Sequence, residues 1–294
     1  MIGNRIGVPY FSHKPLFGGT GLNVQAENGD YLITEGGDWI IQEGNIRYYR
    51  GDGAGDYVDC VTASAPFNID STQDLSIVFW VRLTSSNLQN FLFWNFGNTS
   101  ANKDNRIMLT YSSPLNRLTA RVRSLGVNFD NQWDLTDNSA ATGITDNVTK
   151  WTALQRGNTN ADGWTMITVT YDASEAAGAD ALKMYWNTAA MSVSAASTSG
   201  TRTAMAATHG RIGENLGETD SQGNVLADMD EIKIYNKVLT PAEISTIYNS
   251  GVILNAASTV ESGLITEWSF DDGTGDDRED VYTCTLVNAI TAPY

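Results

Sequence analysis

The stretch Asp228-Met-Asp-Glu-Ile-Lys-Ile-Tyr-Asn-Lys-Val-Leu-Thr-Pro-Ala-Glu-Ile-Ser-Thr-Ile-Tyr-Asn-Ser-Gly251 decides the fold class, because in it a strand passes directly into a short helix. The apolar residues first follow the period of an extended segment and then the period of about 3.6 of a helix. Thr240, Pro241 and Glu243 have the pattern of an N-cap, a first helical residue and a capping-box partner. The stretch therefore predicts a single short helix that docks on a β-protein.

Length, composition and charge are consistent with one large all-β domain and an appendage. The chain has 294 residues and 27 glycines, and few of its segments have a helical period. It carries 34 acidic and 18 basic residues, and its net charge is −16. Such a charge repels nucleic acids and anionic membrane surfaces, so we expect no nucleic-acid partner.

The sequence predicts neither a membrane span nor a secretory signal peptide. No segment approaches the roughly 18 consecutive apolar residues that a membrane helix requires. The first five residues include one arginine, but no apolar run follows them. We therefore expect either a mature form or a protein that reaches the outside by another route, such as a virus particle released by lysis.

Residues 1–44 differ in kind from the rest of the chain. They contain a short repeat, Glu27-Asn-Gly-Asp-Tyr-Leu-Ile-Thr-Glu35 followed by Gly36-Gly-Asp-Trp-Ile-Ile-Gln-Glu43. Each copy places a Gly-Asp turn before a three-residue apolar core, which predicts a small β-hairpin. Two such strands bury little surface alone, so we expect them to pack on the main domain, a neighbouring subunit or a partner. The repeat resembles Gly-Asp-Tyr/Phe-Leu-Ile-Thr-Glu repeats of bacteriophage structural proteins.

From residue 45 onward, successive segments resemble the strands of the laminin G-like, or concanavalin A-like, jelly-roll family, in the family's order. The segment 228–251 resembles its closing strand and helix, and the others are residues 46–59, 74–83, 163–172, 181–187 and 209–213. The resemblance implies an all-β, two-sheet antiparallel jelly-roll sandwich over residues 45–294, with residues 1–44 as an extended arm and hairpin. Asn187 is followed by Thr188 where the family usually has glycine, so we expect a longer turn there.

The chain departs from the family at its C-terminal end. Residues 263–286 resemble the segment that normally opens a laminin G-like domain. We expect the strand Gly263–Phe270 to pair antiparallel with Met229–Asn236 in the same chain, with Trp268 and Phe270 in the core and Leu264 on the same face. Alternatively, this segment begins a truncated second repeat or completes the sandwich of an adjacent subunit.

Two cysteines, Cys60 and Cys284, are too few for a disulfide scaffold. The family resemblance implies that the strands that carry them lie close together. A product folded in a reducing cytosol keeps its thiols reduced, so we expect free thiols.

The sequence offers little for catalysis. Only His13 and His209 are available for a histidine metal centre or a Ser-His-Asp triad. β-Glucanases of the concanavalin A-like fold carry a Glu-x-Asp-x-Glu arrangement on one strand, and the alternating Asp228 and Asp230 do not reproduce it. We therefore expect a protein without enzymatic activity.

Calcium is a better candidate ligand. Asp271, Asp272, Asp276, Asp277 and Asp280 supply hard oxygen ligands within a Gly-rich loop, and Asp228 or Asp230 can join them if the predicted strands pair. The alternative is a solvated acidic loop.

Trp133 and Trp151 lie in Asn128–Asp162, a stretch rich in Asn, Asp, Thr and Gly that is predicted to be a long loop; we expect them either to stack on sugar faces or to anchor the loop against the sheet. Three other tryptophans lie inside strand patterns and are expected in the core or against a sheet; these are Trp80, Trp164 and Trp186.

Two functions remain open. In the first, the chain is a virion structural protein, a capsid decoration or tail-associated surface protein, in which residues 1–44 bind other virion proteins and the jelly roll lies on the virion surface. The resemblance implies a homo-oligomer that displays a lectin-like domain, with a host glycan as a further partner. In the second, the chain is a carbohydrate-binding or adhesion module of an extracellular protein.

Overall fold

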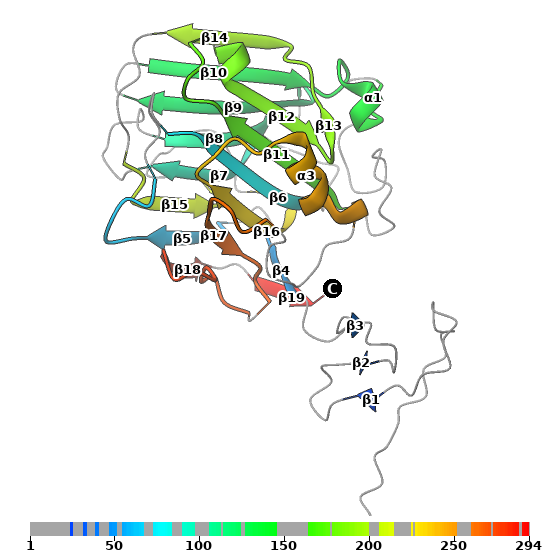
Figure 1. Cartoon of the computed structure of the whole chain (residues 1–294), viewed down its shortest axis with the longest axis vertical. Coiled ribbons are helices and arrows are strands. Elements are labelled where there is room, and N and C mark those ends of the chain that lie inside the picture. The colour runs from blue at the N-terminus through cyan, green and yellow to red at the C-terminus, as the bar shows by residue number, and fades with distance from the viewer. Residues whose placement is uncertain are drawn as a thin grey trace, which may run out of the picture. The chain divides into compact units, whose positions relative to one another are not determined.

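The structure is a computed structural model of the whole chain (Figure 1). It describes residues 24–25, 32–33, 39–40, 47–51, 55–67, 73–83, 90–97, 106–112, 114–124, 127–145, 164–176, 178–199, 206–214, 225, 227–251, 260–271, 273–287 and 290–293. The chain divides into two compact units, one of residues 1–46 with 293–294 and one of residues 47–292. In the first unit, β1 (Val24–Gln25), β2 (Leu32–Ile33) and β3 (Trp39–Ile40) pair antiparallel in chain order.

The second unit is an antiparallel β-sandwich, as the sequence predicts. One sheet, which we call the long sheet, has the strand order β14-β10-β9-β8-β7-β15-β5-β18. Its strands are β5 (Tyr57–Val61), β7 (Phe91–Gly97), β8 (Arg106–Ser112), β9 (Arg117–Ser124), β10 (Val127–Asp134), β14 (Ala195–Ser199), β15 (His209–Ile212) and β18 (Thr283–Val287).

The opposite sheet, which we call the helix-side sheet, has the order β13-β12-β11-β6-β16-β4-β19, and β17 also pairs with β16. Its strands are β4 (Arg47–Arg50), β6 (Leu75–Leu83), β11 (Thr165–Tyr171), β12 (Leu182–Trp186), β13 (Ala189–Ala190), β16 (Ala227–Tyr235), β17 (Leu264–Trp268) and β19 (Ile290–Pro293). The main core lies between the two sheets, and Trp186 is part of it.

The helix α3 (Pro241–Tyr248) is the longest in the described part of the chain; α1 (Ser139–Thr142) and α2 (Gly178–Ala181) are single turns, and η1 (Asn249–Gly251) follows α3. Thr240 and Glu243 form the predicted reciprocal capping box. The helix covers the outer face of the helix-side sheet (Figure 1). There Tyr248 stacks on Trp80, with ring centroids 5.6 Å apart. Trp164 is buried in the same layer, as expected. None of the described helices is long and apolar enough to cross a membrane.

The predicted pairing of the C-terminal strand is confirmed. β17 runs antiparallel to β16 in the same chain, and Trp268 and Phe270 enter the main core. The expectation for Leu264 is wrong, because a β-bulge shifts the register between Ile234 and Tyr235 and pairs Tyr235 with Leu264. Leu264 consequently packs in the outer layer beneath α3.

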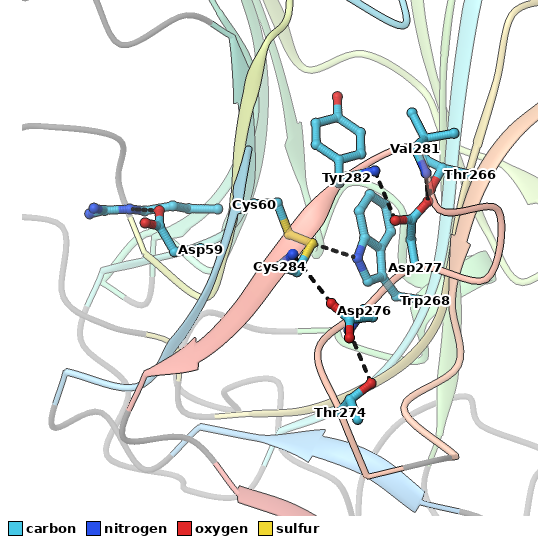
Figure 2. The surroundings of a disulfide bond; sticks show 11 residues. Asp59, Cys60, Thr266, Trp268, Thr274, Asp276, Asp277, Val281, Tyr282 and Cys284 are labelled. Atoms are coloured by element: carbon cyan, nitrogen blue, oxygen red, sulfur yellow. Dashed lines mark hydrogen bonds and ion pairs between the residues drawn. A yellow bond between two sulfur atoms is a disulfide. The ribbon is translucent and has the colours of Figure 1, made fainter. Parts of the chain in front are cut away.

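Two further expectations are corrected by local geometry. Asn187 and Thr188 form a two-residue hairpin turn between β12 and β13, because Asn187 adopts the left-handed conformation (φ 56°) that asparagine tolerates. Cys60 and Cys284 lie directly opposite each other on β5 and β18, as the resemblance implies, but they form a disulfide (Figure 2). The expectation of free thiols is therefore wrong.

Candidate functional site

The outward face of the long sheet is polar along its whole middle. On β8, Ile107, Leu109 and Tyr111 enter the core. Because side chains alternate along a strand, Arg106 and Thr110 lie on the opposite face. The same alternation places further polar residues of β9 and β10 on that face, namely Arg117, Thr119, Arg121, Arg123, Asp130, Gln132 and Asp134. We call this surface the polar face.

Register places these side chains in rows across the strands. In one row, Arg121 of β9 lies opposite Asp130 of β10, and their Nε and Oδ2 atoms are 3.2 Å apart. In the row nearest the end of β9, Arg117 lies opposite Asp134 and forms an ion pair with it. Arg117 also donates from Nη1 to Oε1 of Gln132 at 2.6 Å. Met108 of β8 lies opposite Arg121 in the same row, so the array of donors and acceptors is interrupted there by an apolar side chain.

The polar face continues over β7, β15 and β5. Asn95, Arg211 and Asp59 lie opposite one another across these strands. Arg211 donates from Nε to Oδ1 of Asp59 at 2.8 Å and from Nη1 to Glu214 at 2.7 Å. Its guanidinium also lies 4.5 Å from the centroid of the Tyr57 ring. In this half of the face, one positive group thus interacts with two carboxylates.

Some buried side-chain atoms on the polar face make no hydrogen bond within the described residues. They include Nε of Arg121, Nε of Arg123 and Oδ1 of Asp130. Asp130 and Arg121 remain partly exposed, at 18% and 25%. Buried polar atoms in folded proteins are almost always satisfied, and exceptions call for an explanation such as a water or an ion. The partly exposed ion pair makes the polar face the candidate binding surface.

The carboxylates on β10 are poorly spaced for hydrolysis of a glycosidic bond. Asp130 and Asp134 are four residues apart, which on a strand is about 13 Å. The two carboxyl groups of a glycosidase are separated by roughly 5–10 Å. Each of the two is also paired with its own arginine. The distance between Asp130 and Asp134 therefore does not match the carboxylate pair of a glycosidase.

The structure does not bring the tryptophans proposed for sugar stacking to a surface. Trp133 is fully buried in the main core, on the inward face of β10, so its ring cannot stack on a glycan. The physical reason is that Val127–Asp134 is a regular strand, which turns Trp133 inward. Trp151 lies outside the described residues.

The proposed calcium ligands are only partly described. Asp230 is buried on β16, where its Oδ1 accepts a hydrogen bond from the Glu231 amide at 2.8 Å. Burial, with Glu231 and Asp271 nearby, raises its pKa well above 3.8. Asp276 accepts from the Cys284 amide at 3.4 Å (Figure 2), and Asp272 lies outside the described residues. Among the residues with described positions, no three acidic, His or Cys side chains are placed to hold a metal ion.

Part of the acidic loop has a structural role. Figure 2 shows the buried Asp277 pointing toward Thr266 and the backbone that precedes β18. Its carboxylate accepts from the Thr266 hydroxyl and from the amides of Val281, at 3.0 Å, and Tyr282, at 2.9 Å. Asp277 therefore fixes the turn that returns the chain from β17 to β18.

A second polar cluster lies on the outer face of the helix-side sheet, along β16. Asp228 accepts from Arg50 at 2.8 Å and from Arg82 at 2.7 Å. The exposed fraction of the Asp228 side chain is 1%. The Asp228 and Asp230 pair that was considered for catalysis is thus buried.

Next to it, Lys233 of β16 forms ion pairs with Glu231 and Glu267. Burial is the largest effect on Glu231 and raises its pKa to about 8. Glu267 also pairs with Arg278 at 3.1 Å. The charges of this cluster are compensated by one another within the protein.

Comparison with known proteins places the chain in a family. Residues 52–245 match the model of the concanavalin A-like lectin/glucanases superfamily. The chain belongs to this superfamily. No curated protein sequence is significantly similar to it.

Several solved structures of low sequence identity are similar to the chain. A proposed carbohydrate-binding protein from Bacteroides ovatus is similar over 84% of this chain and 60% of its own length, with 10% identity and a TM-score of 0.52. A heptameric SAP-like pentraxin from Limulus polyphemus is similar over 86% of this chain and 97% of its own, with 11% identity and a TM-score of 0.47. The NanB sialidase from Streptococcus pneumoniae matches over 64% of this chain and 27% of its own, with 13% identity and a TM-score of 0.41.

The sequence analysis did not identify the residues of the polar face as a site, although the sequence contains a pattern that indicates this face. In the segments 117–124 and 127–134, polar and charged residues alternate with apolar or core-facing ones. This period of two indicates a strand with one polar face. Which arginine faces which aspartate depends on register and could not be derived from the sequence.

Proposed function

We propose that the chain is a non-enzymatic carbohydrate-binding protein whose sugar site is the polar face of the long sheet. The observation that carries the proposal is the set of unsatisfied groups there, Nε of Arg123 and Oδ1 of Asp130, beside the Arg121–Asp130 ion pair. Sugar hydroxyl groups donate and accept hydrogen bonds, so a glycan can satisfy a guanidinium and a carboxylate together. Membership of a superfamily that includes lectins supports this proposal.

The test is binding of the full chain to a panel of glycans, with Asp130→Asn as the first variant. We expect this variant to lose about tenfold or more in affinity, because a hydrogen bond to a charged group contributes about 1.5–3 kcal/mol. Glu261→Gln is the control for loss of one negative charge, since Glu261 is exposed in the connection that precedes β17 of the helix-side sheet. Circular dichroism checks that both variants fold. Unchanged affinity of Asp130→Asn would remove the polar face as the site.

We also propose that this binding domain is displayed on a virion surface, as a capsid decoration or tail-associated protein attached through residues 1–44. The support is the short repeat in residues 27–43, which resembles bacteriophage structural proteins. A truncation of residues 1–44 is expected to stop incorporation into particles and formation of the native oligomer. If the truncated chain still copurifies with particles, the attachment role is wrong, and the extracellular adhesion module becomes the favoured setting.

Calcium stays a prediction, because Asp272 of the predicted ligand set lies outside the described residues. Adding calcium or a chelator during a thermal melt tests it. Bound calcium would raise the melting temperature of the wild type and leave that of Asp276→Asn unchanged.

A further inference from the structure

β18 is attached to the long sheet along one side. It is an edge strand of this sheet, and β5 is its neighbour among the described strands. None of the five side chains of β18, all of which the structure describes, is buried; Thr283 and Thr285 are exposed, and Cys284, Leu286 and Val287 are half-buried. Burial of apolar side chains is the dominant favourable term in folding, so packing contributes little to the attachment of this strand.

The chain is anchored to the core immediately before β18. Only 3% of Tyr282 is exposed, and its ring packs on Trp268 and Phe96, with centroids 5.6 and 6.3 Å away. The amide of Tyr282 donates to the buried carboxylate of Asp277 at 2.9 Å. Further along the chain, β19 pairs with β4 of the helix-side sheet. The segment that contains β18 is therefore bounded at both ends by contacts that do not involve β5.

The disulfide is the covalent link between this segment and the long sheet (Figure 2). Cys60 is fully buried on β5, whereas Cys284 is half-buried on β18. Apart from the bond, β18 is held mainly by its pairing with β5 over five positions. Fixing the backbone of one residue costs about as much free energy as one backbone hydrogen bond returns, so an edge strand with little burial is only marginally stable. The disulfide is therefore the strongest single attachment of β18.

We propose that the bond between Cys60 and Cys284 is a redox latch for β18. In oxidising surroundings, such as the outside of a cell, the bond holds β18 on the edge of the long sheet. In reducing surroundings, such as a cytosol, the bond opens and residues 283–287 leave β5, while the core between the two sheets stays folded. This inference does not depend on the proposed sugar site.

The reductant is a dithiol, and it reaches the bond from the Cys284 side, which is the more exposed. One thiolate of the dithiol attacks Sγ of Cys284; a mixed disulfide forms, and Cys60 leaves as a thiolate that takes up a proton. The second thiol of the reductant then attacks the mixed disulfide and releases Cys284 as a thiol. The dithiol is oxidised to a cyclic disulfide, and the protein gains the electron pair as its two thiols.

Release of β18 changes the border of the polar face. Thr285 of β18 lies opposite Asp59 of β5, and the carboxylate of Asp59 pairs with Arg211. When β18 leaves, β5 becomes the edge strand, and the backbone groups that paired with β18 are exposed to water. The redox state of the bond thus decides whether this border is closed or open.

The experiment compares hydrogen exchange in the oxidised full-length protein and after treatment with dithiothreitol, read peptide by peptide in a mass spectrometer. We expect the amides of Thr283–Val287 to exchange about tenfold or more faster after reduction, while those of Thr165–Tyr171 in β11 remain protected over the same time. Reoxidation with glutathione disulfide is expected to restore the protection of β18. The Cys60→Ala/Cys284→Ala variant is the matched control, because its β18 should exchange at the fast rate with and without dithiothreitol.

Each other outcome overturns the latch. If β18 stays equally protected after reduction, the bond is not what holds the strand. If β11 loses protection together with β18, or if the double variant does not fold, the whole sandwich depends on the bond. A bond that dithiothreitol does not reduce in the folded protein, seen as an absence of alkylated cysteines, excludes entry from the Cys284 side. Fast exchange that reoxidation does not reverse excludes a switch.

Discussion

Removing the disulfide between Cys60 and Cys284 is expected to destabilise the sandwich strongly. The two residues are separated by 224 positions, so the bond closes a loop that includes most of the chain. A disulfide lowers the conformational entropy of the unfolded chain. For a loop of this length, the resulting stabilisation of the folded state is about 5 kcal/mol at 25 °C. Losses of about 2–5 kcal/mol are typical when native disulfides are removed, so we expect a value in that range.

The position of the disulfide explains why its removal should lower the stability of the sandwich. β18 is the edge strand of the long sheet, and β5 is its described partner in the sheet. Cys284 also accepts a weak hydrogen bond from Nε1 of the buried Trp268, at 3.4 Å (Figure 2). A Cys60→Ala/Cys284→Ala variant removes both the cross-link and this acceptor, whereas chemical reduction of the wild type removes the cross-link alone. The difference between the two measures the sulfur contact.

The assay is equilibrium unfolding in urea of the oxidised protein, the reduced protein and the double variant. Alkylation under denaturing conditions without a reductant, followed by mass measurement, counts the thiols beforehand. Two alkylated cysteines in the untreated protein would refute the bond itself. An unfolding midpoint that reduction leaves unchanged would refute the argument from loop closure.

Three further predictions follow from single sites. Trp268→Ala should lower the free energy of unfolding by about 3–5 kcal/mol, because Trp268 is fully buried and stacks on Phe96; a loss below 1 kcal/mol would show that β17 contributes little to the core. Burial raises the pKa of Glu231 to about 8, so the folded state retains a proton that the unfolded state loses, and stability should fall as pH rises from about 4.5 to 8. Glu231→Gln should flatten that dependence, which urea unfolding at several pH values measures. Thr240→Ala removes the N-cap of α3 and should cost about 1 kcal/mol, seen as a lower melting temperature, with Thr246→Ala on the same helix as comparison.

Most strands could be predicted from the sequence, because their apolar and polar residues alternate and the same alternation is found in the folded strands. β6 and β11 pair over seven positions in the order that the family resemblance implies. The capping box of α3 is a local device of neighbouring residues, so it too can be derived from sequence. The bulges of β16 cannot be derived in this way. Glu231 adopts a left-handed conformation (φ 48°) within a buried strand, which only the neighbouring strands can impose.

The candidate site was harder to predict than the fold. The asparagine- and aspartate-rich composition around Trp133 favours a loop, yet pairing with β9 and β14 makes Val127–Asp134 a strand. Side-chain packing across the sheets overrides composition here, because each strand gains its stability from neighbours that are distant in the sequence. The same holds for Cys60 and Cys284, whose pairing depends on the register of β5 and β18.

The two polar clusters of the sandwich differ in what they offer a ligand, and the difference supports the polar face as the proposed site. Along β16, Asp228 and Lys233 are almost fully buried and each has two partners of opposite charge within the protein. Such a cluster has no capacity left for a ligand, and breaking one pair leaves an uncompensated buried charge. On the long sheet, Arg121 and Asp130 remain partly exposed, and Nε of Arg123 makes no hydrogen bond in the described residues. The proposed ligand would therefore form hydrogen bonds there without replacing a buried ion pair.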